Sequence, residues 1–164
     1  MKNNRCLPDL CQIVNGLQYL HYLNIVHCNI RPSSILLTSR GAVKLSGFSR
    51  ARCVERVSRT PQCKGSIKWS APETHFNGNI KHIFAIDTFS LGCVFGYLLS
   101  GCKHIFGFDR HHIMFNIARG NIQQRVLWKI NNDTLCKLVI NMTNYIPETR
   151  PTLTDVFIQL KHEC

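Results

Sequence analysis

The stretch of sequence that decides the fold runs from residue 25 to residue 37 and reads Ile25-Val26-His27-Cys28-Asn29-Ile30-Arg31-Pro32-Ser33-Ser34-Ile35-Leu36-Leu37. An apolar pair opens the stretch, a non-periodic segment follows over residues 27–34, and a β-prone run closes it. A second β-prone run at residues 42–45 comes after the turn-like Ser39-Arg40-Gly41. The sequence therefore predicts an irregular loop that leads into a small β-hairpin.

Helical periodicity lies on both sides of this hairpin. Before it, apolar side chains recur at helical spacing at Leu10, Val14 and Leu17, which predicts an amphipathic helix over about residues 8–23. After it, residues 87–99 are apolar nearly all round. A helix without a polar face is typical of a central, buried position.

Shorter helices are predicted in the rest of the chain, near residues 111–118 and 134–142. Thr152 and Asp155 have the spacing of a capping box, so a last helix is expected over about residues 152–161. Residues 46–70 show no periodicity and predict a long loop, and loops of that length are usually functional or disordered. The expected fold class is mainly α, with a small β-hairpin.

Composition places the chain among globular proteins, because 164 residues with 45% apolar content suffice for one buried core. Residues 2–5 lead into no apolar run, and the longest apolar stretch, residues 84–99, contains Asp87. We therefore expect neither a signal peptide nor a membrane segment. The nine cysteines are scattered and form no C-x-x-C pair, which predicts reduced thiols in a cytoplasmic compartment, without a disulfide framework or a metal site.

Positive charge is concentrated in one segment. The net charge is +11, and residues 40–68 hold eight basic residues against one acidic residue, Glu55. Such a segment attracts nucleic acid, phosphoryl groups or acidic proteins, or it is simply a solvated loop. Residues 49–68 contain no Phe, Tyr or Trp for stacking on bases, which counts against an RNA-binding function.

Five ordered motifs resemble the C-terminal lobe of a protein kinase. Residues 25–37 resemble the catalytic loop, I-V-H-R-D-L-K-P-x-N-I-L-L, and residues 46–49 resemble S-D-F-G. Residues 65–73 resemble G-T-x-x-W-x-A-P-E. The start of the central helix and the segment before the last helix are residues 87–92 (D-x-x-S-x-G) and residues 147–152 (P-x-x-R-P-T).

This resemblance implies one domain over residues 1–164, a partial protein kinase domain with no N-lobe. Its parts would be a catalytic-loop region at 25–37, an activation segment at 46–73, a central helix at 87–99 and a last helix at 152–161. No G-x-G-x-x-G phosphate loop occurs in the sequence.

Within the kinases, the chain resembles the inositol-requiring-enzyme family of the unfolded protein response. Residues 89–95 read F-S-L-G-C-V-F and residues 103–107 read K-H-I-F-G, similar to the family's F-S-x-G-C-V-F and K-H-P-F-G. In that family a transmembrane stress-sensing segment precedes the kinase and a ribonuclease domain follows it. The kinase lies on the cytosolic side of the endoplasmic reticulum membrane, so the resemblance implies a cytoplasmic chain with a role in stress signalling.

The resemblance also implies that catalysis is lost. Phosphoryl transfer needs a carboxylate to orient the attacking hydroxyl, and it needs oxygen ligands for magnesium. Asn29 stands at the position of the catalytic Asp, while Ser34 and Gly47 replace the metal-binding Asn and Asp. Arg31 keeps the charge of the family's Lys but has a different shape. We therefore predict an inactive pseudokinase, without the ATP and magnesium of a serine/threonine kinase.

The same resemblance implies that this chain keeps the residues that hold the kinase fold together. Glu73 and Arg150 match an ion pair between the activation segment and the last helix, and Asp87 matches the cap of the catalytic loop. His27 and Phe48 match a stacked internal pair.

Regulation by loop phosphorylation is also altered, because Cys28 replaces the Arg that receives a phosphorylated loop. The candidate phosphosites are Ser58, Thr60 and Ser66.

Three functions stay open at this point. The first is a pseudokinase lobe that binds a protein partner, for which a full-length kinase relative is the first candidate. The second is a fragment of a kinase/endoribonuclease whose other parts carry the activity. The third is a basic module that contacts RNA.

Overall fold

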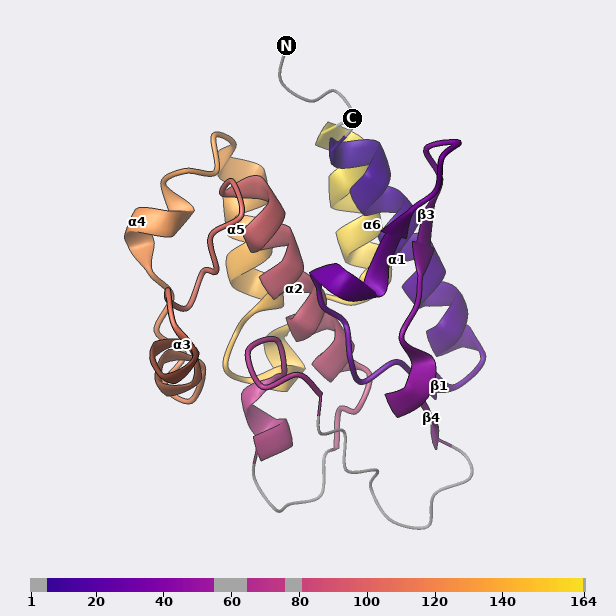
Figure 1. Ribbon diagram of the computed structural model, residues 1–164, viewed down its shortest axis with the longest axis horizontal. Helices are drawn as coiled ribbons and strands as arrows, with labels where there is room; N and C mark the ends of the chain where they lie inside the picture. The colour runs from indigo at the N-terminus through magenta and orange to yellow at the C-terminus, as the bar shows by residue number, and fades with distance from the viewer. Residues whose placement is uncertain (1–5, 55–64, 76–80, 164) are drawn as a thin grey trace.

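The computed structural model describes residues 6–54, 65–75 and 81–163 (Figure 1). Within these residues the chain forms a helical domain with two small β-ribbons. The longest helix is α1 (Cys6–Tyr22), followed by α2 (Ala85–Leu99) and α6 (Leu153–Glu163). Three shorter helices, α3 (Arg110–Ile117), α4 (Gln124–Leu127) and α5 (Asp133–Met142), lie between α2 and α6 in the sequence.

Helix α2 forms the centre of the domain. Residues 86–96 are buried without interruption, as expected for a helix that is apolar on every face. Helix α5 packs against it, and α1 packs against α6, so that α2 lies between α5 and the α1–α6 pair in Figure 1. Gly92 permits the close approach of α2 and α5, because a Cβ added there would lie 2.7 Å from the Cβ of Met142.

The expected hairpin is present and lies against α1. Strand β2 (Ile35–Leu37) pairs antiparallel with β3 (Val43–Leu45), with Leu36 opposite Lys44. Helix α1 covers β3 and also anchors it, since the Gln12 side-chain oxygen accepts a hydrogen bond from the Val43 N–H at 3.0 Å. Local β propensity therefore predicted the right pairing.

The expectation of one long loop over residues 46–70 is partly wrong. Strand β4 (Arg52–Cys53) pairs antiparallel with β1 (Ile25–Val26), just before the residue 27–34 loop. Both strands have two residues, too few to show a period of two in the sequence. A short 3₁₀ turn at Phe48–Arg50 adds further local order, and another at Pro72–His75 follows the segment. The part of the segment at residues 55–64 lies outside the described residues.

The helix ends follow capping rules. In α6, the Thr152 N–H donates to Asp155 Oδ2 at 3.0 Å and the Asp155 N–H donates to Thr152 Oγ1 at 3.2 Å, as the capping box predicts. Asp109 and Asn132 cap α3 and α5, where each side chain accepts one backbone N–H, from His112 and Leu135 respectively. Helix α4 was missed in the sequence because a single turn shows no periodicity.

The structure bears on two expectations from composition, those of reduced thiols and of no membrane segment. Within the described residues, Cys53, Cys93, Cys102 and Cys136 are free thiols, whereas Cys28 is disulfide-bonded. The expectation of reduced thiols is therefore wrong for Cys28. None of the described helices is long and apolar enough to cross a membrane.

Candidate functional site

The three positions that break the catalytic pattern come together in space. Gly47 follows β3, and Asn29 and Ser34 lie in the loop between β1 and β2. A Cβ added at Gly47 would lie 3.5 Å from Ser34 Cβ and 3.8 Å from Asn29 Nδ2. The hairpin holds this arrangement, because the Ser46 N–H donates to the Ser34 carbonyl at 2.8 Å. One small cluster therefore contains Asn29, Ser34 and Gly47.

Side-chain chemistry in this cluster is sparse. Gly47 has no side chain, and its φ of +78° is a left-handed conformation that glycine adopts without strain. The Ser34 hydroxyl is buried, donates to the Arg31 carbonyl at 2.8 Å and accepts from the Arg31 N–H at 3.0 Å. It closes the Pro32–Ser34 turn, so its hydrogen and one lone pair are already used. Arg31 itself is exposed.

The carboxylate beside the cluster is occupied with backbone. Asp87, at the first turn of α2, is fully buried. Its Oδ1 accepts the Cys28 N–H at 2.9 Å, and its Oδ2 accepts the His27 N–H at 2.8 Å. The His21 ring nitrogen Nε2 lies 3.0 Å from the same Oδ2. Asp87 thus binds the backbone at the start of the residue 27–34 loop, which is the capping position that the resemblance implies.

His27 connects the loop to the segment after β3. Its Nδ1 accepts the Asn29 N–H at 3.3 Å, which leaves the ring proton on Nε2 to donate to the Ser46 carbonyl at 2.9 Å. The ring of Phe48 lies 5.0 Å from that of His27, in a tilted contact. His27 is buried, whereas the Phe48 side chain is 47% exposed, so only one member of the pair is internal.

The residues of the cluster do not fit magnesium. Mg²⁺ prefers hard, anionic oxygens in a near-octahedral array. The cluster offers one amide oxygen from Asn29, one engaged hydroxyl and one missing side chain, while Asp87 is already engaged with the loop. In the described part of the chain, no group of three or more His, Cys, Asp or Glu residues could hold a metal ion.

The contrast is sharp at the Glu73–Arg150 pair. Arg150 Nη1 and Nη2 donate to Glu73 Oε1 at 2.6 Å and Oε2 at 2.8 Å, a bidentate geometry. Further donors of Arg150 reach three carbonyls, those of Ala85, Tyr145 and Asn144. The Arg150 side chain is fully buried and lies over the Phe89 ring at 4.9 Å, so all five N–H groups have an acceptor and one face of the guanidinium contacts a ring.

The candidate regulatory residues are only partly described. Ser58 and Thr60 lie outside the described residues. Ser66 is half-buried, and its carbonyl accepts N–H groups from Trp69 and Ser70, so it lies in an ordered turn. Cys28, at φ +60°, lies next to Gly65, where an added Cβ would come 2.6 Å from the Cys28 carbonyl oxygen. The segment after residue 64 therefore packs directly on the residue 27–34 loop.

Comparison with known proteins agrees with this geometry. The protein kinase domain family matches residues 4–161. The chain belongs to the protein kinase family. What the structure describes of it is a helical kinase-like domain that lacks a full N-lobe.

The relatives of this kinase chain include two of the inositol-requiring type. Serine/threonine-protein kinase/endoribonuclease IRE1a of Arabidopsis thaliana is 32% identical over 152 residues, which cover 89% of this chain and 18% of the relative. Probable serine/threonine-protein kinase ireA of Dictyostelium discoideum is 28% identical over 151 residues, 92% of this chain and 15% of the relative. The chain thus spans less than a fifth of either relative.

A third relative matches a shorter part of the kinase chain. Mitogen-activated protein kinase kinase kinase YODA of Arabidopsis thaliana is 42% identical over 82 residues, half of this chain. The matches to IRE1a and ireA confirm, over most of the chain, the similarity to inositol-requiring-enzyme kinases that the sequence indicated.

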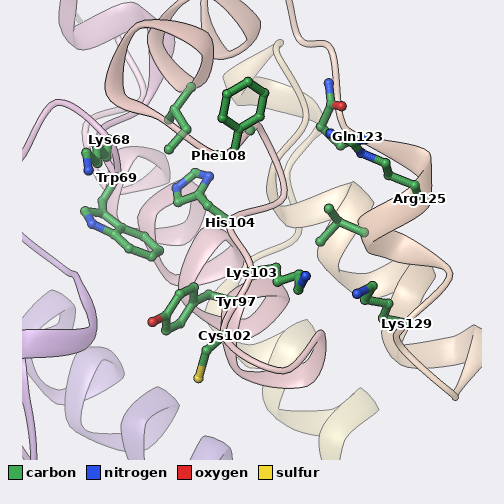
Figure 2. Close-up of a pocket in the computed structure, with 13 residues that line it drawn as sticks. Lys68, Trp69, Tyr97, Cys102, Lys103, His104, Phe108, Gln123, Arg125 and Lys129 are labelled. Atoms are coloured by element: carbon green, nitrogen blue, oxygen red, sulfur yellow. The ribbon is translucent and has the colours of Figure 1, made fainter.

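Sequence reasoning missed a hollow near the C-terminal end of α2. Its volume is about 720 Å³, and segments far apart in the sequence line it (Figure 2). They include Lys68 and Trp69, the end of α2 at Tyr97, and Lys129 after α4. The sequence signal was limited to Lys103 and His104, which belong to the K-H-I-F-G motif, and it indicated family rather than a cavity.

Proposed function

We propose that this chain is a catalytically inactive kinase lobe that acts by binding protein. The supporting observation is the convergence of Asn29, Ser34 and Gly47 in one cluster without a free carboxylate. An amide accepts a proton far less readily than a carboxylate, so Asn29 cannot serve as the base or orienting group of phosphoryl transfer. ATP and magnesium are accordingly not cofactors of this chain, and its role is non-catalytic.

The retained scaffold supports the binding part of the proposal. Glu73, Asp87 and Arg150 keep their family side chains and form hydrogen bonds through them. The positions that phosphoryl transfer uses have changed residue type. A lobe that keeps its shape without its catalytic groups can still occupy the surface on which a related kinase docks. The first candidate partner is a full-length relative of the inositol-requiring type, with the chain on the cytosolic side and a role in stress signalling.

The catalytic part is tested with purified chain, radiolabelled ATP, magnesium and a basic protein as acceptor. Incorporation should stay at background. The double variant Asn29→Asp with Gly47→Asp should not recover it, because the sequence lacks a phosphate-covering glycine loop. Incorporation by the unmodified chain that disappears in Asn29→Ala would refute inactivity.

The binding part is tested by sedimentation of the chain with the kinase domain of IRE1a or ireA. A heterocomplex should form, and autophosphorylation of the relative should fall as the chain is added. If neither species changes at micromolar concentrations of both proteins, a relative of this type is not the partner.

A second candidate function rests on the relatives themselves. The match covers 89% of this chain but only 18% of IRE1a, whose printed name includes an endoribonuclease. The chain would then be one part of a kinase/endoribonuclease in which other parts carry the activity. The coding sequence on both sides decides this, because an adjoining glycine-loop N-lobe and ribonuclease region would favour it over an independent binding lobe.

A further inference from the structure

The hollow between Trp69 and Lys129 has the features of a ligand site, and it lies apart from the Asn29–Gly47 cluster. At about 720 Å³ it falls in the range of small-molecule pockets, roughly 300–1,000 Å³. Its wall is formed by the segment at Lys68 and Trp69, the end of α2, the loop that precedes α3, and α4. Figure 2 shows the imidazole of His104 among the side chains of Trp69, Phe108 and Tyr97.

The charge of this hollow is one-sided. Among the described residues that line it, none is acidic and four are cations, namely Lys68, Lys103, Arg125 and Lys129. The pKa of Lys129 is lowered, first by a hydrogen-bonding contact with the Lys103 side chain and then by the like charges of Lys103 and Arg125. Asp109 follows the lining residue Phe108 in the sequence, but its carboxylate caps α3, where it accepts the His112 N–H at 2.9 Å. Like charges gathered without a counter-charge favour the binding of an anion.

A buried donor without a partner adds an independent observation. His104 is 8% exposed, and its Nε2 makes no hydrogen bond with the described residues. The Phe106 N–H donates to Nδ1 at 3.2 Å, so the neutral ring carries its proton on Nε2, as a free N–H. The nearby Lys68 carbonyl favours the protonated ring, but its geometry falls short of a hydrogen bond. Unsatisfied buried donors are rare in folded proteins, and this one lies in the wall of the hollow, beside the Lys68 carbonyl.

Aromatic surface determines the rest of the ligand. Trp69 lies edge-on to His104 at 4.5 Å and to Tyr97 at 5.5 Å, and Phe108 is 72% exposed at the rim. Aromatic walls bind a planar ring through offset or edge contacts. Burial lowers the pKa of His104 to about 4, so the ring is a neutral donor near pH 7, while the lysines supply the positive charge.

We propose that this hollow binds a small aryl phosphate, with the ring against Trp69 and Tyr97 and the phosphate facing Lys103 and Lys129. A phosphate monoester carries close to two negative charges at neutral pH, which matches a cluster of several cations. The site is distinct from the position at which kinases hold ATP, and it does not depend on the loss of catalysis.

The experiment uses the full 164-residue chain with Trp128→Phe, which leaves Trp69 as the single tryptophan. Trp128 is 81% exposed and outside the hollow, so its replacement should not disturb the site. Phenyl phosphate is titrated at low salt with excitation of Trp69, and inorganic phosphate and phenol are titrated in parallel. Phenyl phosphate should change the Trp69 emission saturably and bind at least about tenfold more tightly than either half alone, and added salt should weaken it.

Charge-matched variants assign the binding to this place. Lys103→Gln with Lys129→Gln should weaken phenyl phosphate about tenfold, by the sum of two exposed ion contacts. Lys44→Gln with Lys137→Gln removes the same charge from exposed positions outside the hollow and should leave the affinity unchanged.

Three results would overturn the proposal. The first is no saturable change with phenyl phosphate at millimolar concentration. The second is equal weakening by the two lysine pairs, which would indicate a diffuse charge effect. The third is equal affinity for phenyl phosphate and inorganic phosphate, which would leave no role for the aromatic wall.

Discussion

The Asn29–Ser34–Gly47 cluster and the Glu73–Arg150 joint lie in one kinase lobe, yet they differ in how completely their polar groups are used. The cluster offers one amide and one hydroxyl bound to its own turn. At the joint, the guanidinium makes five hydrogen bonds and an aromatic contact while fully buried. The positions that phosphoryl transfer requires have lost their chemistry, whereas positions that hold the fold have kept theirs. This pattern is expected if the folded shape, rather than catalysis, is what the chain supplies.

The largest expected effect is at the joint. Arg150→Ala should lower the free energy of unfolding by about 3–5 kcal/mol, because it leaves the Glu73 carboxylate, 17% exposed, without its partner and removes one donor from each of three carbonyls. Asn29→Ala, the matched change in the cluster, should cost less than about 1 kcal/mol, since no side-chain hydrogen bond of Asn29 contributes to the described fold. Urea melts of both variants measure the difference. Equal losses would remove the distinction between the two regions.

A smaller effect is expected where the central helix meets α5. Gly92→Ala should cost about 1–3 kcal/mol, because the new methyl group would meet Met142 and Thr143 at 2.7 and 2.8 Å in a packed core. Gly16→Ala in α1 is the control. Its methyl group meets only the flexible end of Leu45 at 3.3 Å, and alanine favours a helix, so its stability should be close to that of the unmodified chain. Thermal melts that rank the two variants in the opposite order would show that α2 and α5 are less tightly packed than described here.

The smallest expected effect is that of nucleotide. Millimolar ATP with magnesium should leave the melting temperature of the chain unchanged, because a ligand stabilises a fold only in proportion to RT ln(1 + [L]/Kd). ATP without metal is the control. A rise that requires magnesium would mean that the cluster, or another group of residues, supplies metal ligands, and the contrast between the two regions would then be wrong.

The sequence by itself determined the order of the helices other than α4, and it determined the local motifs. The apolar run of α2 predicted a central position, and its buried residues 86–96 confirm this. The spacing of Thr152 and Asp155 predicted the cap of α6, and β propensity predicted the β2–β3 hairpin. These features depend on periodicity and on contacts between near neighbours, which a linear sequence contains.

Only the tertiary structure decided which distant residues meet. The two-residue β1–β4 pairing gave no periodic signal, although it joins residues 25 and 53. The resemblance marked Asn29, Ser34 and Gly47 one by one, but their distances show that they form a single cluster. The hollow lined by Trp69, His104 and Lys129 depends on chain segments that are up to 60 residues apart. Its charge and its unpaired Nε2–H arise because packing brings those segments together, and no local pattern in the sequence records that approach.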